Sequence, residues 1–148
     1  MKSFRTIVAT SAALMALTAL SAPTAQADTK SLADSIMRMD YRTFSHYKAT
    51  RAPRPFNWRS DGCSSPVPLL YQFDIPCQQH DFGYRNYGNG LRLGRDGNTR
   101  AWIDRRFHEE TRRLCFHRFS YNDLSWCLGQ AWIMYVAVRN RGSSYFYG

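Results

Sequence analysis

Apolar residues recur at three- and four-residue spacing along much of the chain, and strand-like patterns occur only as short runs. This spacing predicts helices over residues 31–49, 98–116 and 123–139. Asp40 can divide the first of these into two short helices. Segments rich in glycine or proline separate the helices, and the sequence has no internal repeat. We therefore expect a mainly α protein, folded as one small helical domain.

A further helix is expected to begin at Asp74 and Pro76, and its polar residues set it apart. An acidic residue and a proline are favoured at a helix start, and Gly88 suits a helix end. One face of this helix carries a cysteine, a base, a carboxylate and two phenols: Cys77, His80, Asp81, Tyr84 and Tyr87. A face that only packed would carry Leu, Ile or Val there. We interpret it as a face for chemistry or for metal binding.

The 98–116 segment places a carboxylate, Asp104, in the middle of its apolar stripe. The same side of the helix carries Phe107, Thr111, Leu114 and Cys115. Glu109 and Glu110 fall on the opposite side, where we expect solvent. A carboxylate removed from water needs a partner. Within its own helix, Arg100 and His108 are the candidates.

The first 27 residues predict a secretory signal peptide. Lys2 and Arg5 precede an apolar run that is too short to span a bilayer, and residues 25–27 form a small-x-small cleavage site. We expect cleavage after Ala27, which leaves residues 28–148 as a single secreted domain.

The expected mature chain is strongly basic. The whole chain has a formal charge of +9, and without Lys2 and Arg5 eighteen basic residues face eleven acidic ones, a net +7. Such a charge suits contact with nucleic acid, with an anionic membrane or with a bacterial envelope, and does not choose among them.

All four cysteines follow the predicted cleavage site, and an even number in an oxidising compartment favours two disulfides. The sequence alone permits three pairings, of which Cys63–Cys77 with Cys115–Cys127 is the simplest because both bonds are local. A zinc site built from Cys63, Cys77 and His80 is the alternative, but the spacing is not that of a zinc motif. We therefore expect a helical domain stapled by two disulfides.

Local pairing of Cys63 with Cys77 would bring an acidic turn to the helix face that carries Asp81. Cys77 and Asp81 are one turn apart, so a bond to Cys63 draws Asp61 and Gly62 towards that face. Carboxylates and loop carbonyls are hard oxygen ligands, which suit calcium better than zinc or copper. The sequence therefore predicts a calcium site.

His80 needs an acceptor that orients its ring, and Asp104 on the neighbouring helix is the natural candidate. A His–Asp pair can take a proton from water, and the sequence has no Gly-x-Ser-x-Gly nucleophile motif. A cation alongside would polarise the carbonyl under attack. This combination fits hydrolysis of an ester that lies next to an anionic group such as a phosphate.

The segment from Cys77 to Asn86, Cys-Gln-Gln-His-Asp-Phe-Gly-Tyr-Arg-Asn, preceded by Asp61-Gly-Cys63, resembles secreted phospholipase A2 of the bacterial and fungal type. The resemblance covers roughly Trp58 to the C-terminal helix. It implies two long antiparallel helices that carry the active site. It also implies calcium-dependent hydrolysis of the sn-2 ester of glycerophospholipids, at a membrane or micelle surface. Under this interpretation no nucleic acid is bound and the protein is a monomer.

The family's functional residues carry over by position. His80 matches the catalytic histidine and Asp104 the aspartate that orients it. Asp81 and Asp61 match the calcium carboxylates, and Gly62 matches the residue that offers a backbone carbonyl. The chain has fewer cysteines than the animal enzymes, as the microbial type does. Gly62 stands where microbial relatives usually have a bulkier residue, which keeps the carbonyl but can loosen the loop.

Two other functions stay open. A basic secreted ribonuclease would account for the arginine excess, although a second acid–base group and a phosphate-binding lysine are missing near His80. A catalytically inactive relative could act as a membrane-perturbing toxin, with Trp58 and residues 145–147 contacting lipid. The intact set of His80, Asp81 and Asp104 argues against it.

Overall fold

The computed structural model describes residues 22–63, 68–69 and 71–148. Most of the predicted signal peptide lies outside these residues. The described chain is helical: α1 (Ala22–Arg38), α2 (Tyr41–Thr50), α3 (Asp74–Gly83), the π-helical turn η1 (Tyr84–Gly88), α4 (Gly97–Arg118), α5 (Tyr121–Arg141) and α6 (Ser143–Tyr147). The expected mainly α class is confirmed within this part of the chain.

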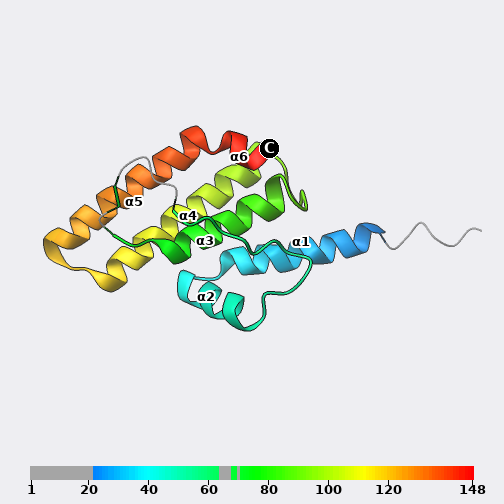
Figure 1. Cartoon of the computed structure of the whole chain (residues 1–148), viewed down its shortest axis with the longest axis horizontal. Coiled ribbons are helices and arrows are strands. Elements are labelled where there is room, and N and C mark those ends of the chain that lie inside the picture. The colour runs from blue at the N-terminus through cyan, green and yellow to red at the C-terminus, as the bar shows by residue number, and fades with distance from the viewer. Residues whose placement is uncertain (1–21, 64–67, 70) are drawn as a thin grey trace, which may run out of the picture.

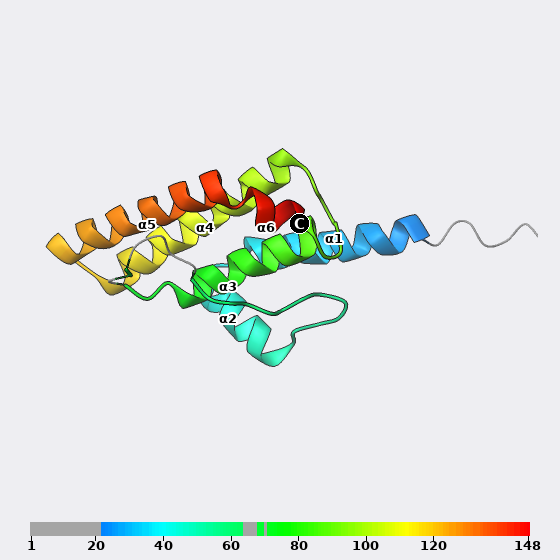
Figure 2. The ribbon, with the colours of Figure 1, turned by 45° about the horizontal axis from the view of Figure 1, so that its top comes forward.

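Three helices form the centre of the molecule (Figure 1). The long helix α4 packs against α3 on one side and α5 on the other, and α3 runs antiparallel to α4. In Figure 1, α1 and α2 lie on the opposite side of α3 from α5, and the turned view keeps α2 on that side (Figure 2). The short C-terminal α6 returns to pack on η1. The antiparallel pair of α3 and α4 is therefore enclosed by the other helices.

Two of the helix starts are set by aspartate side chains. Asp40 caps α2 by accepting hydrogen bonds from the backbone N–H groups of Arg42 and Thr43, which confirms the expected break. Asp96 caps α4 in the same way. Asp74 does not cap α3, because Phe73 holds the cap position and Asp74 lies in the first turn. There its charge favours the positive end of the helix dipole.

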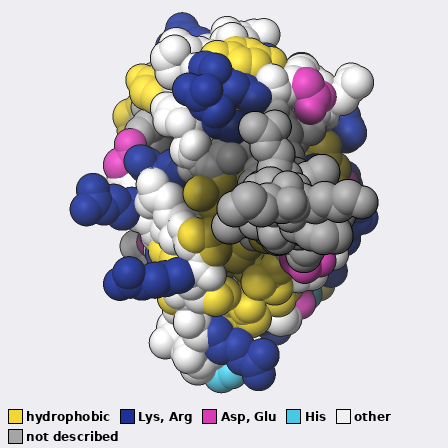
Figure 3. Space-filling view, turned by 90° about the vertical axis from the view of Figure 1, so that its right-hand side faces the viewer, with side chains coloured by type: hydrophobic (Ala, Val, Ile, Leu, Met, Phe, Trp, Pro, Cys, Tyr) yellow, Lys and Arg dark blue, Asp and Glu magenta, His cyan; other side chains and the backbone are white. Residues whose placement is uncertain are grey.

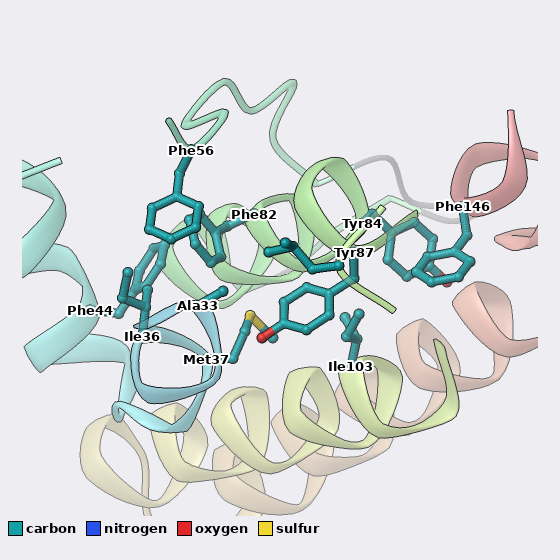
Figure 4. Packing of buried hydrophobic residues seen from close by; sticks show 11 residues of the cluster. Ala33, Ile36, Met37, Phe44, Phe56, Phe82, Tyr84, Tyr87, Ile103 and Phe146 are labelled. Carbon is teal, nitrogen blue, oxygen red and sulfur yellow. The ribbon is translucent and has the colours of Figure 1, made fainter. Parts of the chain in front are cut away.

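Buried side chains form two clusters, and α3 and α4 contribute side chains to both. The first, drawn in Figure 4, joins Ala33, Ile36, Met37, Phe44, Phe56, Phe82, Tyr84, Tyr87, Leu93, Ile103 and Phe146. The second joins Tyr41, Phe73, Cys77, Phe107, Leu114, Cys115, Cys127, Ala131 and Met134. Trp58 packs on the first cluster, with its ring centroid 4.6 Å from that of Phe82. It therefore helps to close the core.

Glu110 was expected in solvent and is instead fully buried. Its carboxylate accepts hydrogen bonds from the backbone N–H of Tyr41 at 2.8 Å and from Arg106 Nη2 at 2.8 Å. Arg113 Nε lies 3.3 Å away. The expectation was wrong because the junction between α1 and α2 covers this side of α4, and the periodicity of one helix does not reveal what packs on it.

No helix in the described residues is both long enough and apolar enough to cross a membrane.

Candidate active site

The ring of His80, on α3, faces Asp104 in the middle of α4. His80 Nε2 lies 2.9 Å from Oδ1 of Asp104, and the two side chains are 10% and 0% exposed. The rings of Tyr84 and Phe107 pack against the imidazole, with centroids at 4.2 and 5.0 Å. The structure therefore brings together the two residues that the sequence proposed as an acid–base pair.

Asp104 is held by donors from three elements. Besides the bond to His80, Oδ1 accepts a hydrogen bond from the Tyr84 hydroxyl at 2.8 Å, and Oδ2 accepts one from Arg139 Nη1 at 2.7 Å. Arg100 Nη1 lies farther from Oδ2, at 3.9 Å. Burial acts to raise the pKa of Asp104, but the bonds from His80, Arg139 and Tyr84 outweigh burial and hold that pKa below its ordinary value. The carboxylate is therefore ionised.

This ionisation decides which nitrogen of His80 carries the proton. An ionised carboxylate can only accept, so Nε2 of His80 donates to Asp104. The lone pair is then on Nδ1. No group in the described part of the chain forms a hydrogen bond with Nδ1, so His80 can accept a proton from a molecule in the cavity beside it.

A disulfide fixes the turn that was expected to carry metal ligands. Cys63 is bonded to Cys77 on α3, with Cα atoms 5.3 Å apart, and Cys115 is bonded to Cys127. Both bonds are the local pairs. With the Cys63–Cys77 bond formed, the backbone N–H of Asp61 lies 3.2 Å from Oδ2 of Asp81. The turn therefore lies against the face of α3 that carries Cys77 and Asp81, as expected from the sequence.

The carboxylates of Asp61 and Asp81 influence each other. Burial raises the pKa of Asp81, the hydroxyl of Ser60 opposes the rise, and the charge of Asp61 adds to it. Asp61 is more exposed and accepts a hydrogen bond from Arg85 Nη2 at 2.8 Å, which holds the pKa of Asp61 below its usual value. A cation close to both carboxylates would offset their mutual repulsion.

Gly62 adopts a backbone conformation that favours glycine. Its φ of +80° lies in the left-handed region, and a Cβ built there would meet nothing within 4 Å. The constraint therefore comes from the backbone itself and not from crowding. A glycine at this position shapes the turn between Asp61 and Cys63.

The donor set at this turn fits calcium. Within the described residues, no group of three or more His, Cys, Asp or Glu side chains is placed to hold a metal ion. Side chains would thus supply two carboxylates, and the remaining ligands would be backbone carbonyls, water or substrate oxygens. Calcium accepts such mixed oxygen ligands, whereas zinc prefers nitrogen and sulfur.

A cavity of about 560 Å³ opens beside the His80 ring. Asp61, Gly62 and Asp81 line one part of it, and Phe107, Met134, Ala137 and Val138 line another. Its size lies within the usual range for small-molecule sites. The imidazole of His80, the carboxylates of Asp61 and Asp81 and an apolar wall therefore border the same cavity.

Some residues of the site were not assigned a role from the sequence. Tyr84 and Arg139 hold Asp104, while Ser60 and Arg85 bond to Asp81 and Asp61. The spacing of Tyr84 one turn after His80 was a usable signal. Arg139 gave none, because it reaches Asp104 from a helix 35 residues further along the chain. His108, a candidate partner of Asp104, stacks on Tyr135 instead, at 4.8 Å between ring centroids.

A buried His–Asp pair next to two carboxylates, in a disulfide-stapled helical domain, has the groups that a hydrolase acting through water requires. The chain belongs to the prokaryotic phospholipase A2 family, whose pattern matches residues 33–142. The matched range contains His80, Asp104 and the turn at Asp61.

Two fungal proteins named secretory phospholipase A2 are similar to this chain. The protein from Beauveria bassiana is 36% identical over 102 residues, which are 68% of this chain and 51% of the relative. The protein from Arthroderma benhamiae is 36% identical over 107 residues, 68% of this chain and 69% of the relative. The chain thus spans about half the length of the first of these relatives.

Proposed function

We propose that the protein is a secreted, calcium-dependent phospholipase A2, which hydrolyses the sn-2 ester of glycerophospholipids to a lysophospholipid and a fatty acid. The observation that carries the proposal is the buried His80–Asp104 pair beside Asp61 and Asp81 in one cavity. Family membership and the names of the fungal relatives support it.

In the proposed reaction, His80 is the general base and Asp104 orients it. Nδ1 of His80 takes a proton from a water molecule as the water oxygen attacks the ester carbonyl carbon. The bond from Nε2–H to Asp104 stabilises the imidazolium that forms. When the bond between the acyl carbon and the glycerol oxygen breaks, the same proton passes to that oxygen, and the lysophospholipid leaves.

Calcium would be held by the carboxylates of Asp61 and Asp81 and by the backbone carbonyl of Gly62. When bound, it supplies positive charge for the developing oxyanion and for the phosphate of the lipid. The apolar wall formed by Phe107, Met134 and Val138 suits an acyl chain.

Export is part of the proposal. A signal peptide ending at Ala27 and two formed disulfides both suit an oxidising compartment outside the cell. The relatives are named as secretory proteins. We further propose that the protein acts as a monomer on a lipid surface and does not bind nucleic acid.

The test is release of fatty acid from phosphatidylcholine vesicles. We expect release that requires calcium, stops with chelator and is lost in His80→Ala, while His46→Ala, an exposed histidine on α2, keeps wild-type activity. In Asp61→Asn, a higher calcium concentration should be needed for half-maximal release.

The same variants separate the alternatives. Cleavage of RNA without calcium, with no release of fatty acid, would replace the proposal by the ribonuclease. Vesicle leakage that persists unchanged in His80→Ala, again without fatty acid, would replace it by the inactive toxin.

A further inference from the structure

The helix α5 is an outer helix of the bundle, yet it carries no charged residue between positions 124 and 138 (Figure 1). A helix that is uncharged all round is normally enclosed on all sides. Here only one side packs against the core, where Cys127, Ala131 and Met134 are buried. The opposite side therefore presents apolar surface to the outside.

Four positions make up this surface, which we call the outer face of α5: Trp126, Gly129, Trp132 and Ile133. The side chains of Trp126, Trp132 and Ile133 are 70%, 55% and 46% exposed. A Cβ built on Gly129 would meet nothing within 4 Å, so this position also opens outwards. Grouped exposed aromatics and aliphatics on a soluble domain mark a surface that binds something.

The outer face of α5 continues into the cavity. Ala137, one turn after Ile133, lines the cavity together with Arg141 and Tyr145, and Tyr145 is 73% exposed. From Trp126 to Ala137 the helix rises about 16 Å. A surface seated on this face would thus lie next to the cavity that contains His80.

We propose that the outer face of α5 docks onto a phospholipid bilayer, with the helix lying in the plane of the interface. The proposal rests on the proposed function, because the bilayer would present the ester to the cavity. Tryptophan favours the boundary between headgroups and acyl chains. The uncharged part of α5 is shorter than the roughly 20 residues that a spanning helix needs, so it would lie on the bilayer.

The charge of the protein favours a lipid surface over a second copy of the chain. The net charge is +9 for the whole chain and +7 for residues 28–148, and Arg139 and Arg141 end the helix beside the uncharged stretch. An end-on view shows Lys and Arg side chains around the edge of the molecule (Figure 3). Two such molecules repel each other, whereas an anionic bilayer attracts each one.

The test measures binding separately from catalysis. Vesicles of ether-linked phosphatidylglycerol and phosphatidylcholine in equal parts cannot be hydrolysed, so cosedimentation with them reports docking alone. Ile133→Asp and Trp126→Ala should each weaken binding, by roughly tenfold or more for the introduced charge. Leu32→Asp, at a 39% exposed position on α1, is the matched control and should bind as wild type does.

Hydrolysis of a short-chain phospholipid below its micelle-forming concentration is the second readout. Ile133 and Trp126 do not line the cavity, so both variants should hydrolyse this dissolved substrate at the wild-type rate while losing activity on vesicles. If the wild type hydrolyses neither this dissolved substrate nor phosphatidylcholine vesicles but the binding pattern holds, the proposed enzyme is refuted and the docking face is supported.

Two results would overturn the docking face. One is wild-type vesicle binding by Ile133→Asp. The other is a wild-type dimer in light scattering that Ile133→Asp converts to a monomer, since a second copy would then be the occupant.

Discussion

Asp104 connects four elements of the structure through one carboxylate. It lies on α4, it bonds to His80 on α3 and Tyr84 on η1, and it accepts a further bond from Arg139 on α5. Each donor stabilises the ionised form, which outweighs the cost of burial. The same residue therefore orients the imidazole and joins the helices.

Replacing Asp104 by Asn tests its orienting role. An amide can present either a donor or an acceptor to Nε2, so the ring would no longer be held in one tautomer. On dissolved substrate we expect kcat to fall by roughly a hundredfold or more. Asp123→Asn, an exposed acid in the first turn of α5, is the control and should leave kcat unchanged. An Asp104→Asn enzyme with near wild-type kcat, and an unchanged circular dichroism spectrum, would contradict the role.

The pKa of Asp104 also predicts how stability depends on pH. A carboxyl whose pKa is lowered by folding stabilises the folded state above its unfolded value, which is 3.8 for Asp. That contribution is lost as the pH falls below 3.8 through the folded value. Urea unfolding should therefore show a constant free-energy gap between wild type and Asp104→Asn near neutral pH, which narrows below about pH 4. A gap that widens on acidification would contradict this.

At the scale of elements, Glu110 holds the α1–α2 junction to α4. Its two oxygens serve the N–H of Tyr41 and the guanidinium of Arg106, and Arg106 in turn donates to the backbone oxygens of Met37 and Met39. These contacts hold α1 and α2 against the middle of α4. The hydrogen bonds of the buried Glu110 therefore set the position of both helices.

Glu110→Ala should therefore destabilise the protein strongly. The change leaves the buried N–H of Tyr41 without its acceptor and removes one of the two carboxylates that Arg106 contacts, the other being Glu109. This loss should cost about 3 kcal/mol in the free energy of unfolding. Glu109→Ala, at the neighbouring position with a side chain 54% exposed, should cost less than about 1 kcal/mol. Equal urea midpoints for the two variants would show that Glu110 does not act as a tie.

The two disulfides allow a matched comparison between stability and metal binding. Each closes a loop of similar length, with sequence separations of 14 and 12, so replacing either pair by serines should cost about 3 kcal/mol. Only the Cys63–Cys77 bond positions Asp61 against Asp81. Calcium titration by calorimetry should thus weaken in Cys63→Ser/Cys77→Ser and stay near wild type in Cys115→Ser/Cys127→Ser. Equal calcium affinity in the two variants would show that the Cys63–Cys77 bond does not contribute to the proposed metal site.

At the scale of the whole molecule, the sequence predicted the helices better than their packing. The long helices α4 and α5 were found within a few residues of their ends, because their apolar periodicity and the caps around them are local signals. The contact of His80 with Asp104 was also predictable, since a carboxylate within an apolar stripe needs a partner. Arg139 and the burial of Glu110 were not predictable, because both depend on which helix packs against α4.

The tail shows the same distinction. The aromatic residues of the segment 143–148 did not predict how the tail folds. In the structure, residues 143–147 form α6, and Phe146 is buried against Tyr84. A Cβ at Gly88 would collide with the backbone of Phe146, so this glycine permits the close approach of α6 to η1. Such an approach joins positions far apart in sequence, which a pattern along one helix does not report.

The sulfur bond between Cys63 and Cys77 has a consequence for the cell that makes this protein. Before export, cytosolic thiols stay reduced, so no covalent bond then holds the Asp61 turn against α3 and only its hydrogen bonds and ion pair remain. Under the proposed function, a newly made molecule would lack a covalently fixed calcium site while it is still close to the membrane of the cell that produces it. The host membrane would thus be spared until the chain had left.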